Sequence, residues 1–133
     1  MAYSALLVYD WANNTNGEPA MHELPIAENI KDIAIKHAEQ ADAKRITDIF
    51  LVIGQLSSVV DDSIQFYWDL ISKDTLAEGA TLHFKRIPAE IRCKSCSATF
   101  APNGRDYSCP ECGGYLIEII AGDEFFMEAI EVE

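Results

Sequence analysis

Basic residues are scarce in this chain. Its 133 residues include 10 lysines and arginines against 22 aspartates and glutamates, which gives a formal net charge of −12. A protein that binds nucleic acid needs a basic surface to neutralise phosphates, so this balance argues against a DNA- or RNA-binding function. An acidic chain is better suited to metal cations or to basic protein partners.

Long apolar runs are also missing. No stretch approaches the roughly 20 residues that a membrane-spanning helix needs. The apolar residues 5–9 form a shorter run than the core of a secretory signal, and no basic residue precedes them. The sequence contains neither a glycine-rich phosphate-binding loop nor a serine–histidine arrangement typical of hydrolases. With no export signal and with cysteines spaced for metal, we expect a cytoplasmic protein.

The four cysteines of the chain form two closely spaced pairs. Two residues separate Cys93 from Cys96, two separate Cys109 from Cys112, and twelve lie between the pairs. A Cys-x-x-Cys turn directs two sulfurs toward one point, so two such turns supply the four thiolates of a closed structural zinc site. Glycine follows Cys112 and lets the backbone turn back toward the sulfurs. The spacing therefore predicts one zinc ion bound by all four cysteines.

Other uses of these cysteines are weaker predictions. A redox pair would need a Cys-x-x-Cys at the start of a helix, whereas these pairs lie among turn-forming residues. A disulfide framework is typical of small secreted proteins. Iron bound by the same thiolates stays open, because the ligands alone do not separate it from zinc. A hydrolytic zinc site is excluded, because four cysteines leave no coordination position for an activated water, so we expect no enzyme.

Hydrophobic periodicity predicts a fold of the α/β (α+β) class. We expect a small three-stranded sheet with two helices, and a zinc-ribbon-like module inserted between two of the strands. The expected helices cover residues 25–40 and about 58–71, and the expected strands cover 45–54, 81–91 and 124–132.

Three details of these elements can be predicted as well. Strand 45–54 is apolar on both faces, so we expect it at the centre of the sheet. Ser58 and Asp61 have the spacing of a capping box, which predicts a helix start at this point. In the next strand, alternation predicts that Leu82 faces the core and His83 the solvent.

The chain divides into three predicted parts. Residues 1–20 form an N-terminal extension, which has a strand-like run at 3–9 but which we interpret as mobile or loosely docked. Residues 21–91 and 119–133 form the α/β domain, and residues 92–118 form the zinc-binding domain. The zinc segment is too short to fold on hydrophobic burial alone, so metal binding must stabilise it by on the order of 10–16 kcal/mol.

Several short motifs occur in an order that resembles one protein family. They are Met21-His22-Glu23-Leu24, Ile53-Gly54-Gln55-Leu56-Ser57, Phe84-Lys85-Arg86-Ile87-Pro88-Ala89, the two cysteine pairs ending in Cys112-Gly113-Gly114, and the terminal Ile130-Glu131-Val132. By their order and spacing, the chain from Met21 to Glu133 resembles the HypA/HybF family, the hydrogenase nickel incorporation proteins. These are nickel metallochaperones of [NiFe]-hydrogenase maturation. The resemblance implies a small α/β nickel domain with a zinc domain inserted in its sheet.

By this resemblance, His22 is the nickel ligand. In the family it is the second residue of the chain, directly after the initiating methionine, where an amine, a backbone amide and an imidazole surround Ni(II) with nitrogen. Glu23 would contribute its backbone amide or its carboxylate. Met21 supplies an amine only if it begins the chain, and here Ala20 precedes it. With residues 1–20 present, we expect weaker nickel binding or a different geometry. Nickel is bound transiently, whereas zinc is structural.

The resemblance also implies protein partners. These are a GTPase accessory protein of hydrogenase maturation and the hydrogenase large-subunit precursor, and a homodimer is a further possibility. We expect neither nucleic acid nor a membrane as a partner. The alternative function is a zinc-ribbon adaptor or regulator that binds protein or nucleic acid, in which His22 has no metal role. A cluster of basic residues near the ribbon fits that alternative, namely Lys85, Arg86, Arg92, Lys94 and Arg105, while Glu90 and Glu111 oppose it.

Overall fold

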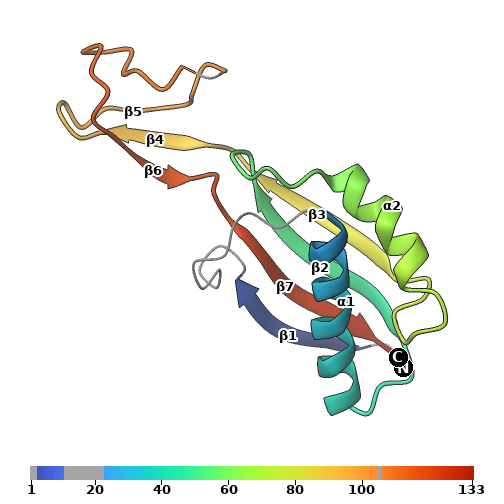
Figure 1. Ribbon diagram of the computed structural model, residues 1–133. Helices are drawn as coiled ribbons and strands as arrows, with labels where there is room; N and C mark the ends of the chain where they lie inside the picture. Colours follow the sequence, from blue (N-terminus) through green and yellow to red (C-terminus); the bar gives the residue numbers. More distant parts are fainter. Residues whose placement is uncertain (1–2, 11–22, 105) are drawn as a thin grey trace.

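A computed structural model describes residues 3–10, 23–104 and 106–133 of the chain. Within these residues it has two helices, α1 (Glu23–Gln40) and α2 (Asp61–Ile71). The strands are β1 (Tyr3–Asp10), β2 (Ile46–Gly54), β3 (Thr81–Ile87), β4 (Glu90–Cys93), β5 (Thr99–Phe100), β6 (Ile117–Ala121) and β7 (Phe125–Val132). Figure 1 shows a main body that contains both helices, and a second, smaller sheet that projects from one end of it.

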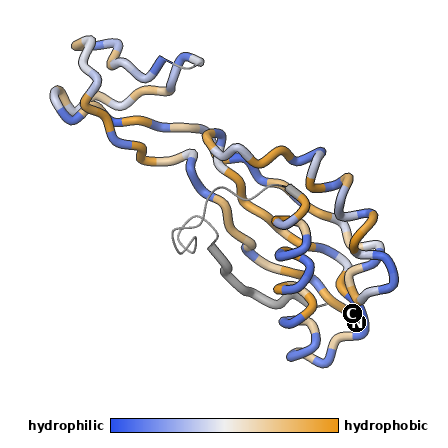
Figure 2. The backbone as a smooth tube through the Cα atoms, viewed as in Figure 1, coloured by the Kyte–Doolittle hydropathy of each residue, from blue (hydrophilic) through white to orange (hydrophobic). Residues whose placement is uncertain are grey.

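The main sheet has four strands in the order β1-β7-β2-β3. β2 runs parallel to β3 and antiparallel to β7, so the predicted central position of β2 is confirmed. Its residues Ile49, Leu51 and Ile53 are fully buried, and Figure 2 shows that this strand is hydrophobic over most of its length. A parallel pair needs a crossover connection, which α2 provides between β2 and β3.

β1 is an addition to the three strands that the sequence predicts. It pairs with β7 in antiparallel register from Tyr3, opposite Val132, to Asp10, opposite Phe126. Residues 3–10 are therefore part of the main sheet and not a loosely docked extension. This pairing depends on the free edge of β7, which the local pattern of residues 3–10 does not reveal. The remaining residues of the extension, 1–2 and 11–20, lie outside the described residues.

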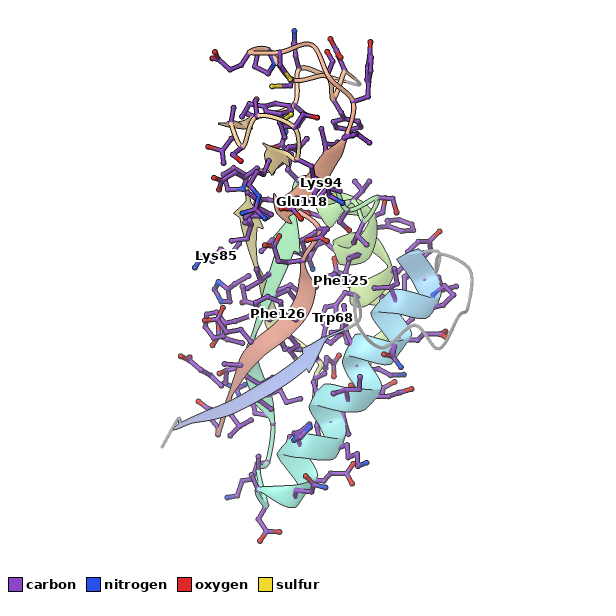
Figure 3. All side chains as sticks on the ribbon, turned by 90° about the vertical axis from the view of Figure 1, so that its left-hand side faces the viewer. Trp68, Lys85, Lys94, Glu118, Phe125 and Phe126 are labelled. Atoms are coloured by element: carbon purple, nitrogen blue, oxygen red, sulfur yellow. The ribbon has the colours of Figure 1, made fainter. Side chains whose placement is uncertain are left out.

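The helices pack on one face of the main sheet, and their predicted positions are confirmed. α2 buries Ile64 and Trp68. In Figure 3, Trp68 and Phe125 lie between the sheet and the helices, whereas Lys85 points away on the other side. Neither of the helices in the described ranges is long and apolar enough to cross a bilayer.

The predicted capping box is wrong. α2 begins at Asp61, and its N-cap residue Val60 makes no side-chain capping bond. The Asp61 carboxylate is instead engaged by Arg86, and the backbone N–H of Val59 donates to the hydroxyl of Ser57 at 3.3 Å. A long-range ion pair thus replaces the local capping bond that sequence spacing favours.

The predicted strand 81–91 is divided between two sheets. β3 ends at Ile87, and after Pro88 and Ala89 the chain enters β4 of the second sheet, whose strand order is β5-β4-β6. Proline has no N–H to donate, so Pro88 adds no ladder hydrogen bond of its own where the chain leaves β3. The predicted orientations in β3 are confirmed, because Leu82 is buried and His83 is exposed.

Three backbone segments meet where the second sheet joins the main body. The backbone N–H of Leu56 donates to the carbonyl of Gly122 at 2.7 Å, and that of Ala89 donates to the Gln55 side chain at 2.8 Å. The packing is so close that a Cβ on Gly54 would lie 2.1 Å from the carbonyl atoms of Gly122. We call this contact of the 54–57, 87–89 and 122–124 segments the junction.

Candidate metal centre

Two similar turns present the cysteine sulfurs. In the first, the N–H of Ser97 donates to the carbonyl of Cys93 at 2.9 Å, and in the second the N–H of Gly113 donates to that of Cys109 at 2.8 Å. Both closing residues have a positive φ, 65° for Ser97 and 73° for Gly113. Glycine adopts this conformation at little cost. The first turn therefore has the same backbone geometry as the second, although Ser97 stands where the second turn has Gly113.

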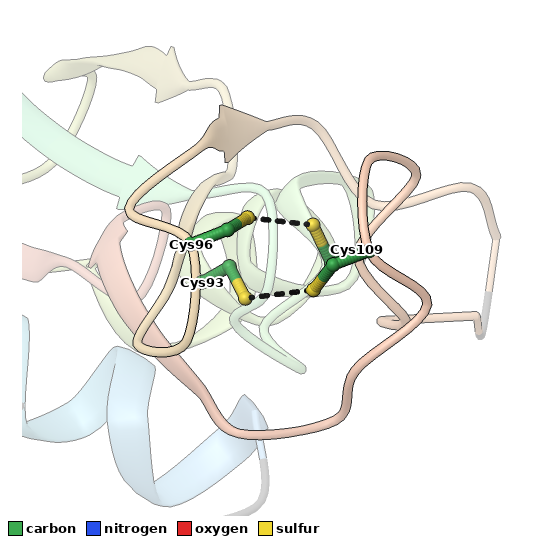
Figure 4. A group of neighbouring side chains, drawn as sticks. Cys93, Cys96 and Cys109 are labelled. Atoms are coloured by element: carbon green, nitrogen blue, oxygen red, sulfur yellow. Dashed lines mark hydrogen bonds between the residues drawn. The ribbon is translucent and has the colours of Figure 1, made fainter.

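The four sulfurs converge on one point. All four Sγ atoms lie within 4.8 Å of one another. Contacts of 3.6 Å join Cys93 to Cys112 and Cys96 to Cys109, so each turn faces the other (Figure 4). A tetrahedral site with Zn–S bonds of about 2.3 Å places its sulfurs about 3.8 Å apart. A disulfide would need about 2.05 Å, and all four cysteines are free.

The sulfurs differ in acidity because their neighbours differ. The backbone N–H of Cys96 is the main cause that lowers the pKa of Cys93 to about 6, against the effect of burial. The amide of Ala98 lowers the pKa of Cys96, but the contact with Cys109 and burial outweigh it and raise the pKa to about 12. Cys93 therefore deprotonates more readily than Cys96, and close contact between the sulfurs opposes a second thiolate. A bound divalent cation removes this repulsion and favours four thiolates.

The sulfur cluster fits a structural metal ion. Cys93 and Cys109 are buried, while Cys96 and Cys112 are exposed. Four protein ligands complete a tetrahedral shell, as structural zinc requires. In the described part of the chain, no other group of three or more histidines, cysteines or acids is close enough to hold a metal.

The predicted nickel residues lie at the start of α1. Met21 and His22 are outside the described residues, and Glu23 is the first residue of the helix. Because only a short connection joins α1 to β2, the helix runs back along that strand. The start of α1 therefore lies toward the end of the main sheet where the second sheet is attached (Figure 1).

Arg86 has a role at this end of the sheet that the sequence analysis did not predict. Its guanidinium donates to the carbonyls of Gly54 at 3.1 Å and Val59 at 2.8 Å, and it pairs with the carboxylate of Asp61. One side chain thus connects the end of β2 with the start of α2. The only sequence signal was its place in the Phe84–Ala89 motif, which gave no indication of its partners.

Two of the arginines near the zinc module pair with acids. Arg92 pairs with Glu118 on the neighbouring strand β6, as Arg86 pairs with Asp61. A nucleic-acid-binding ribbon needs such guanidinium groups free to meet phosphates. These pairs weaken the nucleic-acid form of the alternative function.

Comparison with known proteins agrees with this architecture. The model of the family described as "Hydrogenase/urease nickel incorporation, metallochaperone, hypA" matches residues 21–132. A hydrogenase maturation factor HypA of Dehalococcoides mccartyi is 49% identical over 113 residues, which cover 85% of this chain and 95% of that protein. A second one, of Caldanaerobacter subterraneus subsp. tengcongensis, is 38% identical over 114 residues, which cover 85% of this chain and all of that protein.

Two solved structures have the same fold. The solution structure of the Ni metallochaperone HypA from Helicobacter pylori is 24% identical with a TM-score of 0.57, and it covers 84% of this chain and 97% of that one. A second solution structure of a HypA protein is 25% identical with a TM-score of 0.63, and it covers 86% of this chain and 98% of that one. The chain therefore belongs to the HypA family of nickel metallochaperones, as the order of its motifs suggested.

Proposed function

We propose that this protein binds Ni(II) and delivers it during maturation of [NiFe]-hydrogenase, with no catalytic reaction of its own. The observation that carries the proposal is the family match over residues 21–132, whose description names nickel incorporation. It works in the cytoplasm, and its partners are a GTPase accessory protein and the hydrogenase large-subunit precursor.

The two metals have separate places in this proposal. Cys93, Cys96, Cys109 and Cys112 hold a structural zinc ion in the module that residues 92–118 form. The support is the convergence of the four sulfurs within 4.8 Å. Residues 21–91 and 119–133 form the nickel domain. Because the sulfur site is closed by four ligands, it stabilises the fold and does not exchange its ion with the cargo.

His22 is the proposed nickel ligand, through its imidazole. Glu23 adds its backbone amide or its carboxylate. Met21 adds an amine only in a chain that begins with it, so in the chain with Ala20 present it contributes at most an amide. Delivery requires that nickel can leave again, and a micromolar Kd, roughly 8 kcal/mol, suits that task.

Substitution of His22 tests this function. We expect His22→Ala to weaken nickel binding roughly tenfold or more, because the substitution removes the imidazole from the nickel site. Calorimetric titration of zinc-loaded protein with Ni(II) measures the change.

His83→Ala is the matched control. His83 is exposed on β3, where its Nε2 lies 2.8 Å from Asp48, and it has no proposed role in nickel binding. Its loss should leave the nickel affinity unchanged, and both variants should keep their zinc. Equal nickel affinity of His22→Ala and wild type would remove His22 from the site.

A further inference from the structure

α2 is apolar on more than one face. Ile64 and Trp68 are buried against the core, yet Phe66 and Leu70 are each 63% exposed. The longer helix α1 is different, because its exposed central positions carry charged side chains. These are Glu28, Asp32, Lys36 and Glu39. A surface helix normally turns a polar face to solvent, so α2 has an outer face that the described residues of the chain leave uncovered.

The exposed face of α2 combines apolar and acidic side chains. Phe66 and Leu70 are four residues apart, and Asp62 and Asp69 lie exposed beside them on the same side of the helix. Gln65 donates to Asp69 at 2.9 Å. No lysine or arginine of the described residues is within ion-pair distance of either carboxylate. We call Asp62, Phe66, Asp69 and Leu70 the α2 stripe.

The geometry of the α2 stripe fits another helix. Side chains four residues apart form a ridge on a helix surface, and such ridges pack into the grooves of a second helix. Recognition of an amphipathic helix depends on apolar anchors at this same spacing. Phe66 and Leu70 form an adjacent exposed pair with acidic neighbours, and exposed apolar surface rimmed by polar residues is a feature of interaction sites.

The charge of the α2 stripe selects the partner. A second copy of this chain would bring Asp62 and Asp69 against the same acids. Membrane surfaces and nucleic acids are anionic too, so the stripe repels them. A protein segment with lysine or arginine beside its apolar residues would gain both burial and charge pairing.

We propose that the α2 stripe is a docking site for a basic amphipathic helix of a partner protein. Leucine-like residues one turn apart on that helix pack against Phe66 and Leu70. Its lysines or arginines pair with Asp62 and Asp69. This inference goes beyond nickel delivery, since none of its residues is a proposed metal ligand.

A designed peptide tests the α2 stripe in the full-length, zinc-loaded chain. The probe is a helical peptide of about five turns with leucines at i and i+4 flanked by lysines, and its counterpart has glutamate in place of each lysine. We expect the lysine peptide to bind and to shift the NMR signals of α2, and the glutamate peptide not to bind. Phe66→Ser/Leu70→Ser should weaken binding roughly tenfold or more. Asp62→Asn/Asp69→Asn should weaken it about two- to fivefold and reduce its salt dependence.

The zinc module offers a matched control. Tyr115 and Leu116 are 79% and 68% exposed, so Tyr115→Ser/Leu116→Ser removes a similar apolar area elsewhere. This variant should bind the lysine peptide as wild type does. The proposal is overturned if both serine variants lose the same affinity, if the glutamate peptide binds equally well, or if the peptide shifts signals outside α2 only. Self-association of the chain through α2 at increasing concentration would also overturn it.

Discussion

Cys109→Ala is expected to unfold the zinc module while the main sheet stays folded. Cys109 is buried and contributes one of the four converging sulfurs. Its loss leaves three thiolates and an open position, so the metal is bound far more weakly. Metal binding stabilises small zinc domains by on the order of 10 kcal/mol, and the short strands β4, β5 and β6 have little other core. Zinc content per chain and the dispersion of amide NMR signals report this change.

Ser95→Ala is the control for this substitution. Ser95 lies in the first turn between Cys93 and Cys96, but only its backbone amide contributes to the acidity of Cys93. The variant should keep its zinc and all signals of the module. If Cys109→Ala kept one zinc per chain and an ordered module, the metal would not be what stabilises residues 92–118.

Gly54→Ala is the second substitution with a large expected effect. The new Cβ would lie 2.1 Å from the carbonyl carbon and oxygen of Gly122 and 2.7 Å from the N of Asp123. These are backbone atoms, which cannot rotate away as a flexible side chain can. The junction must therefore open, and the substitution should destabilise the zinc-loaded protein by about 3 kcal/mol or more. Unfolding in urea, followed by tryptophan fluorescence to which buried Trp68 contributes, measures the loss.

Gly79→Ala separates crowding from backbone strain. Gly79 has a φ of +80° but nothing within 4 Å of its added Cβ. The only cost is the left-handed conformation, about 1 kcal/mol. If Gly54→Ala and Gly79→Ala lowered the unfolding midpoint by the same amount, the junction would not be a tightly packed contact.

The junction explains how the two parts of the chain are held together. Hydrogen bonds of Leu56 to Gly122 and of Gly54 to Glu124, each 2.7 Å, join the end of β2 to the segment that leaves the zinc module. Arg86 ties the same end of β2 to the start of α2. The module is therefore joined by direct hydrogen bonds to this end of the main sheet, where α1 also begins.

Most of the regular structure could be predicted from local patterns. Periodicity located both helices, and the apolar composition of β2 on both faces indicated its central place. The cysteine spacing predicted the sulfur cluster, because a Cys-x-x-Cys turn fixes its own geometry. These features depend on residues that are close in sequence.

The features that could not be predicted depend on distant partners. β1 pairs with the edge of β7, which is distant in the sequence. The Asp61 carboxylate pairs with Arg86, 25 residues away, in place of the predicted capping bond. The division between β3 and β4 lies at Pro88 and Ala89, and β4 forms its own sheet only by pairing with β5 and β6. The sequence pattern also did not predict that Phe66 and Leu70 are exposed. Periodicity indicates that α2 is apolar, but it does not indicate how much of the helix surface the rest of the fold buries.

X-ray absorption at both metal edges, on full-length protein purified with its zinc and given one equivalent of Ni(II), tests the separation of the two metals most directly. We predict zinc with four sulfur neighbours at about 2.3 Å and nickel with nitrogen and oxygen neighbours only. Sulfur in the nickel shell, or a protein that is folded without zinc and has its cysteines in disulfides, would contradict this account.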